Sequence, residues 1–350
     1  MVDANTSTAT KLLILKVNQL GDNVVFLPTV QALARAMPGA KITIATSPVA
    51  EPLYRVTCPE VETLTFETRA FNQSWRSPLT LLKICSIFRA LRPDACLIAD
   101  DQSNAAFIMA RASGARTIVG PQLANRIASR LIRHRVPISL HDSVATQNWQ
   151  IAKALLQDLK VSLPTLPTHP PPPDLSQFGV DAPCGILIHP GASRDYKRWP
   201  LDRYITLANG LVQHHPVVWI TQDAEIEQSL RPEVRREKPA NLAAFISLMA
   251  GAQFFIGNNS GPMNIASALG LPGLIFNGPS TPNWDPPWHP ERLTLLRDPA
   301  LKCQPCDALS HPVDRCQNHE QPMICMRRWS VEEVTQITLD RLRSAPPKGS

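Results

Sequence analysis

The stretch LLILKVNQLGDNVVFLPTVQALARAMPGAKI, residues 12–42, alternates apolar runs with an amphipathic segment. The run 12–17 is typical of a buried strand, Gly21-Asp22-Asn23 of a turn, residues 24–36 of a helix and 41–45 of a second strand. Because a strand, a helix and another strand form the repeating unit of parallel sheets, this stretch predicts a doubly wound α/β fold.

The same alternation continues along the chain. Further strands are expected at 95–99, 185–189, 217–221, 253–257 and 273–277, and helices at 77–91, 104–112, 201–214, 242–251, 261–269 and 331–344. The segment VSLPTLPTHPPPPD, residues 161–174, has six prolines and predicts an extended linker. We therefore expect a Rossmann-like domain over 1–163, a proline-rich linker over 164–182, a second such domain over 183–330, and a final helix and tail over 331–350.

The composition is that of a globular protein, with 44% hydrophobic and 18% charged residues among 350. The formal net charge of +6 suits an anionic ligand or an anionic membrane surface, but it is too diffuse to indicate nucleic acid. No signal peptide is visible and no apolar run reaches the ~18 residues of a membrane span. We expect a cytoplasmic protein whose cysteines are reduced.

Asp22 follows the first strand, where ligands of doubly wound sheets bind. It has two interpretations: a helix N-cap, or a general base that faces a substrate hydroxyl. The glycine-rich dinucleotide loop G-x-G-x-x-G is missing, which disfavours a dehydrogenase.

Two later loops predict an anion site. Residues 189–200, HPGASRDYKRWP, carry the Ser193 hydroxyl and the cations Arg194, Lys197 and Arg198. Residues 257–264, GNNSGPMN, place Ser260 and Pro262 at the start of a helix, where free amides and the helix dipole attract phosphates. The alternatives are a solvated basic loop and a capped helix without a ligand.

These blocks, together with IADDQSN (98–104), IHPGASRDYKRWPLDRY (188–204) and FFIGNNSGPMNIASALGLPGLIFNGPS (254–280), occur in an order that resembles glycosyltransferase family 9, the lipopolysaccharide heptosyltransferases. The resemblance covers nearly the whole chain. It implies a GT-B fold, in which two Rossmann-like doubly wound parallel-sheet domains face a cleft, and an inverting transfer of a heptose or related sugar. The donor would be a nucleotide diphosphate sugar such as ADP-heptose, the acceptor a hydroxyl of a lipopolysaccharide core glycolipid, and no catalytic metal or other cofactor would be needed.

The resemblance also implies roles for single residues. Asp22 matches the catalytic base of the family. Asp101 and Gln102 fall where acceptor or sugar is bound. The positions that match donor or phosphate contacts are Ser193, Lys197, Glu225, Asn259, Ser260, Gly261 and Asn264.

Three of these positions depart from the family pattern. Asn259 and Asn264 stand where the family has Asp and His, and the glycines that normally precede Glu225 are missing. The loss of a negative charge at Asn259 leaves open a different sugar nucleotide or a protein acceptor.

Four cysteines form the pattern Cys303-x2-Cys306-x9-Cys316-x8-Cys325. Such spacing can enclose a structural Zn²⁺ or Fe ion, and the alternative is reduced cysteines that pack a loop. A non-enzymatic cysteine finger that binds nucleic acid is a remote alternative, because the basic residues do not gather near it.

The basic run RIASRLIRHR, residues 126–135, is a candidate amphipathic helix. It is either a solvated helix face or a surface that meets phosphorylated lipid, which would bring the protein to the inner membrane as a peripheral protein.

Overall fold

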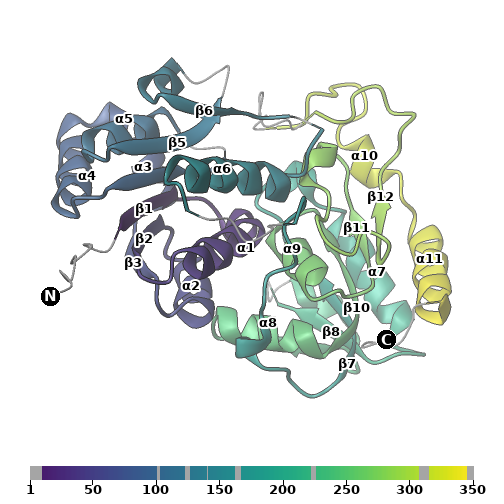
Figure 1. Ribbon diagram of the computed structural model, residues 1–350. Coiled ribbons are helices and arrows are strands. Elements are labelled where there is room, and N and C mark those ends of the chain that lie inside the picture. Colours follow the sequence, from purple (N-terminus) through teal and green to yellow (C-terminus); the bar gives the residue numbers. More distant parts are fainter. Residues whose placement is uncertain are drawn as a thin grey trace, which may run out of the picture. The chain divides into compact units, whose positions relative to one another are not determined.

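The computed structural model describes residues 10–100, 103–122, 127–139, 141–161, 167–221, 226–306 and 315–344. The chain divides into two compact units, residues 1–171 and 172–350, with the division inside the proline-rich segment. Each unit is built on a six-stranded parallel sheet (Figure 1). The predicted doubly wound α/β architecture is therefore confirmed in both.

The first unit has the strand order β3-β2-β1-β4-β5-β6. Its strands are β1 (Lys11–Lys16), β2 (Lys41–Thr46), β3 (Glu62–Thr65), β4 (Ala95–Ile98), β5 (Thr117–Gln122) and β6 (His134–Pro137). Its helices are α1 (Leu20–Ala36), α2 (Glu51–Thr57), α3 (Thr68–Asn72), α4 (Pro78–Ala90), α5 (Asn104–Ala112) and α6 (Val144–Asp158), with short 3-10 turns η1 (Ser74–Arg76) and η2 (Ile127–Leu131).

Helices cover both faces of this sheet, which is why the four central residues of β1, 12–15, are all apolar. One face packs against α1 and α6, which also contact each other. The other face, with Leu13 and Leu15, packs against α3, α4 and α5 around Phe71 and Phe88 (Figure 1).

Two local predictions in this unit were wrong. Residues 21–23 are not a turn, because α1 already begins at Leu20. The run 126–135 is not one helix: η2 ends at Leu131, and His134–Pro137 then pair with β5 as the edge strand β6. Pairing with β5 supplies backbone hydrogen bonds that a local pattern cannot reveal.

The second unit has the strand order β12-β11-β10-β7-β8-β9. Its strands are β7 (Cys184–His189), β8 (Val217–Ile220), β9 (Arg235–Glu237), β10 (Ala252–Asn258), β11 (Gly273–Phe276) and β12 (Leu293–Leu296). Its helices are α7 (Leu201–Leu211), α8 (Leu242–Gly251), α9 (Gly261–Ala268), α10 (Ile324–Arg327) and α11 (Val331–Ser344), and its 3-10 turns are η3 (Ser176–Phe178), η4 (Asp195–Lys197), η5 (Ile226–Ser229) and η6 (Pro282–Trp284).

The core of the second unit forms where α7 and α11 pack together over the sheet. Trp199 lies at its centre, stacked on Phe276 with ring centroids 4.4 Å apart. Within the described residues, no helix has both the length and the apolar character needed to cross a lipid bilayer.

Candidate functional site

Asp22 lies at the carboxyl edge of the first sheet, directly after β1. Residues 17–19 connect β1 to α1, with Gln19 as the N-cap and Asp22 at the third helical position. The Gln19 amide donates a hydrogen bond to Asp22 Oδ2 over 3.1 Å, and the Gln19 side chain accepts one from the Asp22 amide, so the two form a reciprocal capping box. This arrangement fixes the direction of a half-buried carboxylate at the strand end.

The neighbouring Asn23 holds the connection between β1 and α1 in place through side-chain hydrogen bonds. Its fully buried side chain donates to the Gln19 carbonyl (2.8 Å) and accepts from Thr46 Oγ1 (3.1 Å) and Tyr54 Oη (2.8 Å). Burial raises the pKa of Tyr54 well above its usual value, and the charges of Cys58, Asp22 and Asp100 raise it further. Tyr54 therefore stays a neutral hydrogen-bond donor beside this turn.

A buried ion pair, which sequence reasoning missed, also lies at this edge. Lys16 Nζ, at the end of β1, is 2.6 Å from Asp100 Oδ1, just after β4, and both side chains are almost fully buried. Asn148 of α6 donates to the same carboxylate oxygen (2.6 Å) and accepts from the Asp100 amide (3.0 Å). The sequence signal for this pair is Lys16 itself, a charged residue within the otherwise apolar run 12–17.

Three predicted contact residues lie outside the described residues: Asp101, Gln102 and Glu225.

In the second unit, residues 190–200 connect β7 to α7 at the carboxyl edge of the sheet. The fully buried Asn258, the last residue of β10, ties both ends of this loop together. Its Nδ2 donates to the carbonyls of Pro190 (2.8 Å) and Gly191 (3.2 Å), and its Oδ1 accepts from the Trp199 amide (3.0 Å) and Tyr204 Oη (3.1 Å). This positioning residue was also missed, because an asparagine at a strand end gives no sign of its distant partners.

The predicted phosphate-binding residues of the loop differ in exposure. Ser193 is exposed, whereas Lys197, on the short turn η4, is half-buried. Arg198 donates twice to the Ala192 carbonyl (3.0 and 2.6 Å) and pairs with Asp195 at 3.2 Å, so it closes the loop on itself.

The helix α9 begins at this same edge, immediately after β10. Ser260 is its N-cap and Pro262 lies in its first turn, as predicted. The Ser260 hydroxyl does not cap the helix, because it donates to the Asn258 carbonyl over 3.1 Å. The first-turn amides therefore lack a side-chain cap, while Asn264, one turn later, is buried.

Asn259 belongs to a polar chain with a fixed direction. Its Nδ2 donates to Asn277 Oδ1 (2.8 Å) and to the Trp284 carbonyl (3.1 Å). Asn277 Nδ2 in turn donates to Asp285 Oδ1 (2.6 Å), and Arg297 pairs with that carboxylate. Because the Asn277 amide group donates to the Asp285 carboxylate, its Oδ1 faces residue 259 as an acceptor. The side chain at position 259 must therefore donate a hydrogen bond.

His189 ends β7 and packs against the ring of Phe245. Burial lowers its pKa to about 4; local backbone hydrogen bonds oppose that shift and the charge of Arg198 adds to it. The imidazole is therefore neutral at physiological pH. The positive charge of the loop that follows β7 comes from its arginine and lysine side chains alone.

Comparison with known proteins assigns the chain to a protein family. The model of glycosyltransferase family 9 (heptosyltransferase) matches residues 84–315, which is more than half of the chain. The chain belongs to glycosyltransferase family 9. The lipooligosaccharide heptosyltransferase 2 of Haemophilus influenzae is 33% identical over 114 residues, an alignment that spans 29% of this chain and 32% of that relative.

Solved structures agree on the fold of this family 9 chain. The Escherichia coli ADP-heptose lipopolysaccharide heptosyltransferase II has a TM-score of 0.69 at 19% identity and covers 96% of this chain and 99% of its own. The iron-containing dodecameric glycosyltransferase TibC of enterotoxigenic E. coli has a TM-score of 0.59 at 15% identity, covering 98% and 78% respectively. The expected GT-B class is thereby confirmed.

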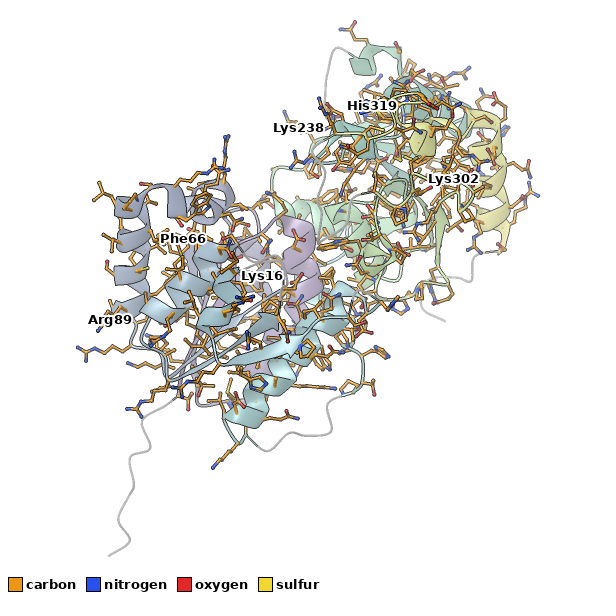
Figure 2. The ribbon with its side chains drawn as sticks, turned by 90° about the horizontal axis from the view of Figure 1, so that it is seen from above. Lys16, Phe66, Arg89, Lys238, Lys302 and His319 are labelled. Carbon is orange, nitrogen blue, oxygen red and sulfur yellow. The ribbon has the colours of Figure 1, made fainter. Side chains whose placement is uncertain are left out.

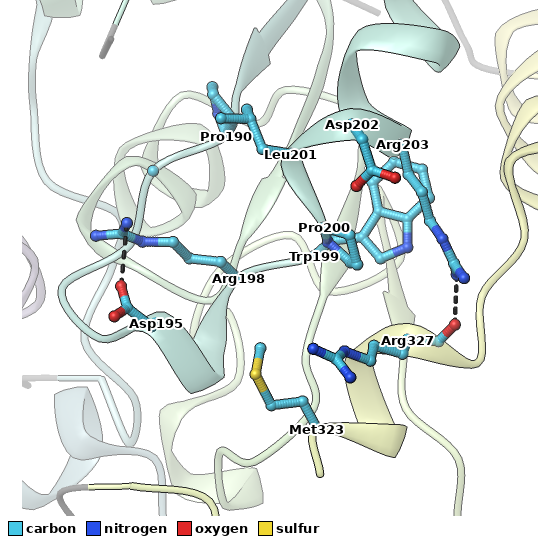
Figure 3. Close-up of a pocket in the computed structure, with 11 residues that line it drawn as sticks. Pro190, Asp195, Arg198, Trp199, Pro200, Leu201, Asp202, Arg203, Met323 and Arg327 are labelled. Carbon is cyan, nitrogen blue, oxygen red and sulfur yellow. Dashed lines mark hydrogen bonds and ion pairs between the residues drawn. The ribbon is translucent and has the colours of Figure 1, made fainter. Parts of the chain in front are cut away.

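A cavity of about 600 Å³ opens in the second unit beside the loop of this family 9 protein (Figure 3). Its walls include Arg198 and Trp199 from the loop, Arg203 of α7, and Met323 and Arg327 around α10. None of the predicted donor contacts lines it.

The four clustered cysteines lie near one another at the end of this chain. The Asn318 amide group contacts Cys303 Sγ at 3.6 Å and the Met323 amide donates to Cys316 Sγ at 3.2 Å. Burial, with smaller contributions from the charges of Cys306, Cys316 and Cys303, raises the pKa of the Cys325 thiol to about 12. Among the described residues, no group of three or more His, Cys, Asp or Glu side chains has the geometry to hold a metal ion.

Proposed function

We propose that this protein is an inverting glycosyltransferase that moves a heptose from a nucleotide diphosphate donor, ADP-heptose, to a hydroxyl of a lipopolysaccharide core acceptor. Family membership supports the reaction class, and the relatives named above support heptose and lipopolysaccharide. The protein acts in the cytoplasm, at the inner face of the membrane that holds the acceptor.

The observation that carries the proposal is the placement of Asp22. A sugar hydroxyl is a weak nucleophile, so a carboxylate within hydrogen-bond reach assists by removing its proton. The capping box with Gln19 engages Asp22 Oδ2 and sets the direction of the carboxylate at the strand end. The acceptor oxygen then attacks the anomeric carbon, and the diphosphate leaves from the opposite side with inversion.

The leaving diphosphate gains negative charge, which the second unit is suited to stabilise. Lys197 and Ser193 on the loop, and the first turn of α9 at Ser260 and Gly261, supply a cation, a hydroxyl and backbone amides. These groups can stabilise the developing negative charge without a divalent cation, so we propose metal-independent transfer. Glu225 and Asn264 complete the proposed donor contacts, and Asp101 and Gln102 those to the acceptor or sugar.

Asn259 favours a second candidate within the same class. Because its side chain must donate to Asn277 and to the Trp284 carbonyl, it brings no negative charge to the donor sugar. A different sugar nucleotide, or a protein acceptor, is consistent with that change.

Cys303, Cys306, Cys316 and Cys325 are the proposed ligands of a structural Zn or Fe ion. The cysteine spacing and the likeness to the iron-containing TibC support this, while the four sulfurs, all among the described residues, do not themselves form a group that could hold a metal ion. Metal analysis of the purified protein by mass spectrometry tests it: one equivalent of metal is expected, and none in a variant with Cys303 and Cys306 both changed to Ser. A metal content at background in both would remove the proposal.

The function is tested by mass spectrometry of products formed from ADP- and UDP-sugars with core glycolipid acceptors. A mass increase of one heptose, with ADP-heptose only, is expected. A product with another donor would select the second candidate, and the absence of product with every donor and acceptor would overturn both.

A further inference from the structure

The first unit exposes large apolar side chains along one face of α4 and the preceding turn η1. Trp75, Leu79 and Leu82 have 55%, 81% and 65% of their surface exposed. Leu79 and Leu82 are three residues apart on the helix, so they share a face, and Phe88 and Ile84 on the opposite face are buried in the core. Apolar groups of this size gathered on one face mark an interaction surface.

Only positive charge accompanies these side chains. Residues 68–92 contain Arg69, Arg76, Lys83, Arg89 and Arg92 but no Asp or Glu. All five cations are exposed, and none forms an ion pair with a carboxylate of the described residues. The guanidinium of Arg76 lies over the ring of Trp75, 5.1 Å from its centroid, so the aromatic anchor itself carries a cation.

A surface hollow of about 690 Å³ continues this face at the end of α4. Arg89, Arg92 and Arg116 line it, with Ser86 and Gly114. Its one lining carboxylate, Asp94, accepts a hydrogen bond from the Lys11 amide over 2.9 Å. The hollow is therefore rich in guanidinium groups, which suit phosphate.

The topology relates this face to Asp22. The segment from α3 to α4 connects the carboxyl end of β3, at Thr65, to the start of β4, at Ala95. Hence Trp75 and Leu79 lie toward the edge of the sheet where Asp22 lies, and the arginine hollow lies toward the opposite edge. Figure 1 shows α4 on the flank of the first unit, and Figure 2 shows Arg89 at its outer side.

We infer that this α4 face, formed by Trp75, Leu79, Leu82 and the cations from Arg69 to Arg92, docks on an anionic phospholipid membrane. The apolar side chains enter the boundary between headgroups and acyl chains, and the cations contact lipid phosphates. Because Trp75 and Leu79 lie toward the carboxyl edge of the sheet, docking through them brings the edge that carries Asp22 close to the membrane surface. The sugars of a lipid-anchored acceptor project from that surface. The inference rests on the proposed function only for this last step.

Co-sedimentation with vesicles tests the docking. The protein binds vesicles that contain phosphatidylglycerol and cardiolipin, and binds phosphatidylcholine vesicles far more weakly. Each cation near the surface contributes about fivefold to partitioning, so a variant with Lys83→Glu and Arg89→Glu loses at least about 25-fold. A variant with Leu79→Ser and Leu82→Ser, which changes exposed positions that the fold does not need, loses about tenfold or more.

Matched controls lie elsewhere on the molecule. Lys160→Glu changes an exposed lysine at the end of α6, and Val180→Ser an apolar side chain with 71% exposure. Each control should change partitioning by no more than a few fold. Equal losses in control and α4 variants, or wild-type binding by the α4 variants, would overturn the inference, as would a concentration-dependent dimer abolished by the same α4 changes.

Activity separates this inference from the proposed function. With an acceptor lacking its acyl chains, the α4 variants should transfer sugar at the wild-type rate, and with acceptor in vesicles they should lose about tenfold. No transfer to either acceptor by the wild-type protein would refute the function and leave the vesicle-binding result standing.

Discussion

The connection between the first strand and the first long helix differs between the two units in its length and in the residues that hold it. In the first unit, residues 17–19 are enough, and the turn is fixed by its own capping box and by the buried Asn23. In the second, residues 190–200 form an extended loop held by a distant residue, Asn258. A short, self-capped connection fixes one carboxylate, whereas a long one carries several of the groups proposed to contact a diphosphate.

The largest effect should come from the carboxylate of the short connection. Asp22→Asn keeps an oxygen that accepts from the Gln19 amide, so the turn persists while the base is lost. Turnover should fall by roughly 10²–10⁴ with donor affinity kept. Gln19→Ala is the matched control, which weakens the cap by about 1 kcal/mol but leaves the base. Turnover of Asp22→Asn equal to that of this control would remove Asp22 as the base.

The buried pair beneath the short connection comes next. Lys16→Met leaves Asp100 charged and buried without its partner, and should lower the free energy of unfolding of the first unit by about 3–5 kcal/mol in urea titration. Lys41, whose ion pair with Glu62 is more than half exposed, is the control: Lys41→Met should cost less than about 1 kcal/mol. Similar losses in both would mean that the burial of Lys16 and Asp100 has no consequence for stability.

Asn258→Ala tests the support of the long connection. It removes four hydrogen bonds of a fully buried side chain, and should destabilise the second unit by about 2–4 kcal/mol and raise the KM for the donor more than it lowers kcat. Asn209→Ala, which removes two bonds at the surface, should stay within about 1 kcal/mol. A donor KM unchanged by Asn258→Ala would show that the loop does not depend on it.

The smallest effect concerns pH. The pKa of His189 is about 4 in the folded state, below its ordinary value of 6.5, so the unfolded chain binds the proton first as pH falls. The free energy of unfolding linked to the neutral His189 is fully present above about pH 6.5 and is lost as the pH falls below that value. The loss amounts to about 2 kcal/mol between about pH 7 and 5. His189→Gln should remove this part of the pH dependence in urea titrations. Parallel pH profiles for the two proteins would contradict the assignment.

The sequence predicted what depends on local pattern. Buried strands such as β1 and β7 contain continuous apolar runs, 12–15 and 186–188, and α9 starts where Ser260 and Pro262 indicate. The strands β3, β6, β9 and β12 were missed because they are short edge strands, and β9 is the charged sequence RRE. The internal strand β5 was also missed, because its sequence TIVGPQ contains a glycine and a proline. Asp22 was placed at the correct edge, but Lys16, Asp100 and Asn258 were not recognised. Their partners lie tens of residues away, so only the folded sheet brings them together.

The directed chain from Asn259 through Asn277 to Asp285 links position 259, a proposed donor contact, to two further positions. An aspartate at position 259 would set its oxygens against Asn277 Oδ1 and the Trp284 carbonyl, both acceptors. Turning the Asn277 amide to meet it would set Oδ1 against the Asp285 carboxylate, which Arg297 holds. A negative charge at this proposed donor contact would therefore require a change at position 277 as well, and Asn259→Asp alone should destabilise the second unit.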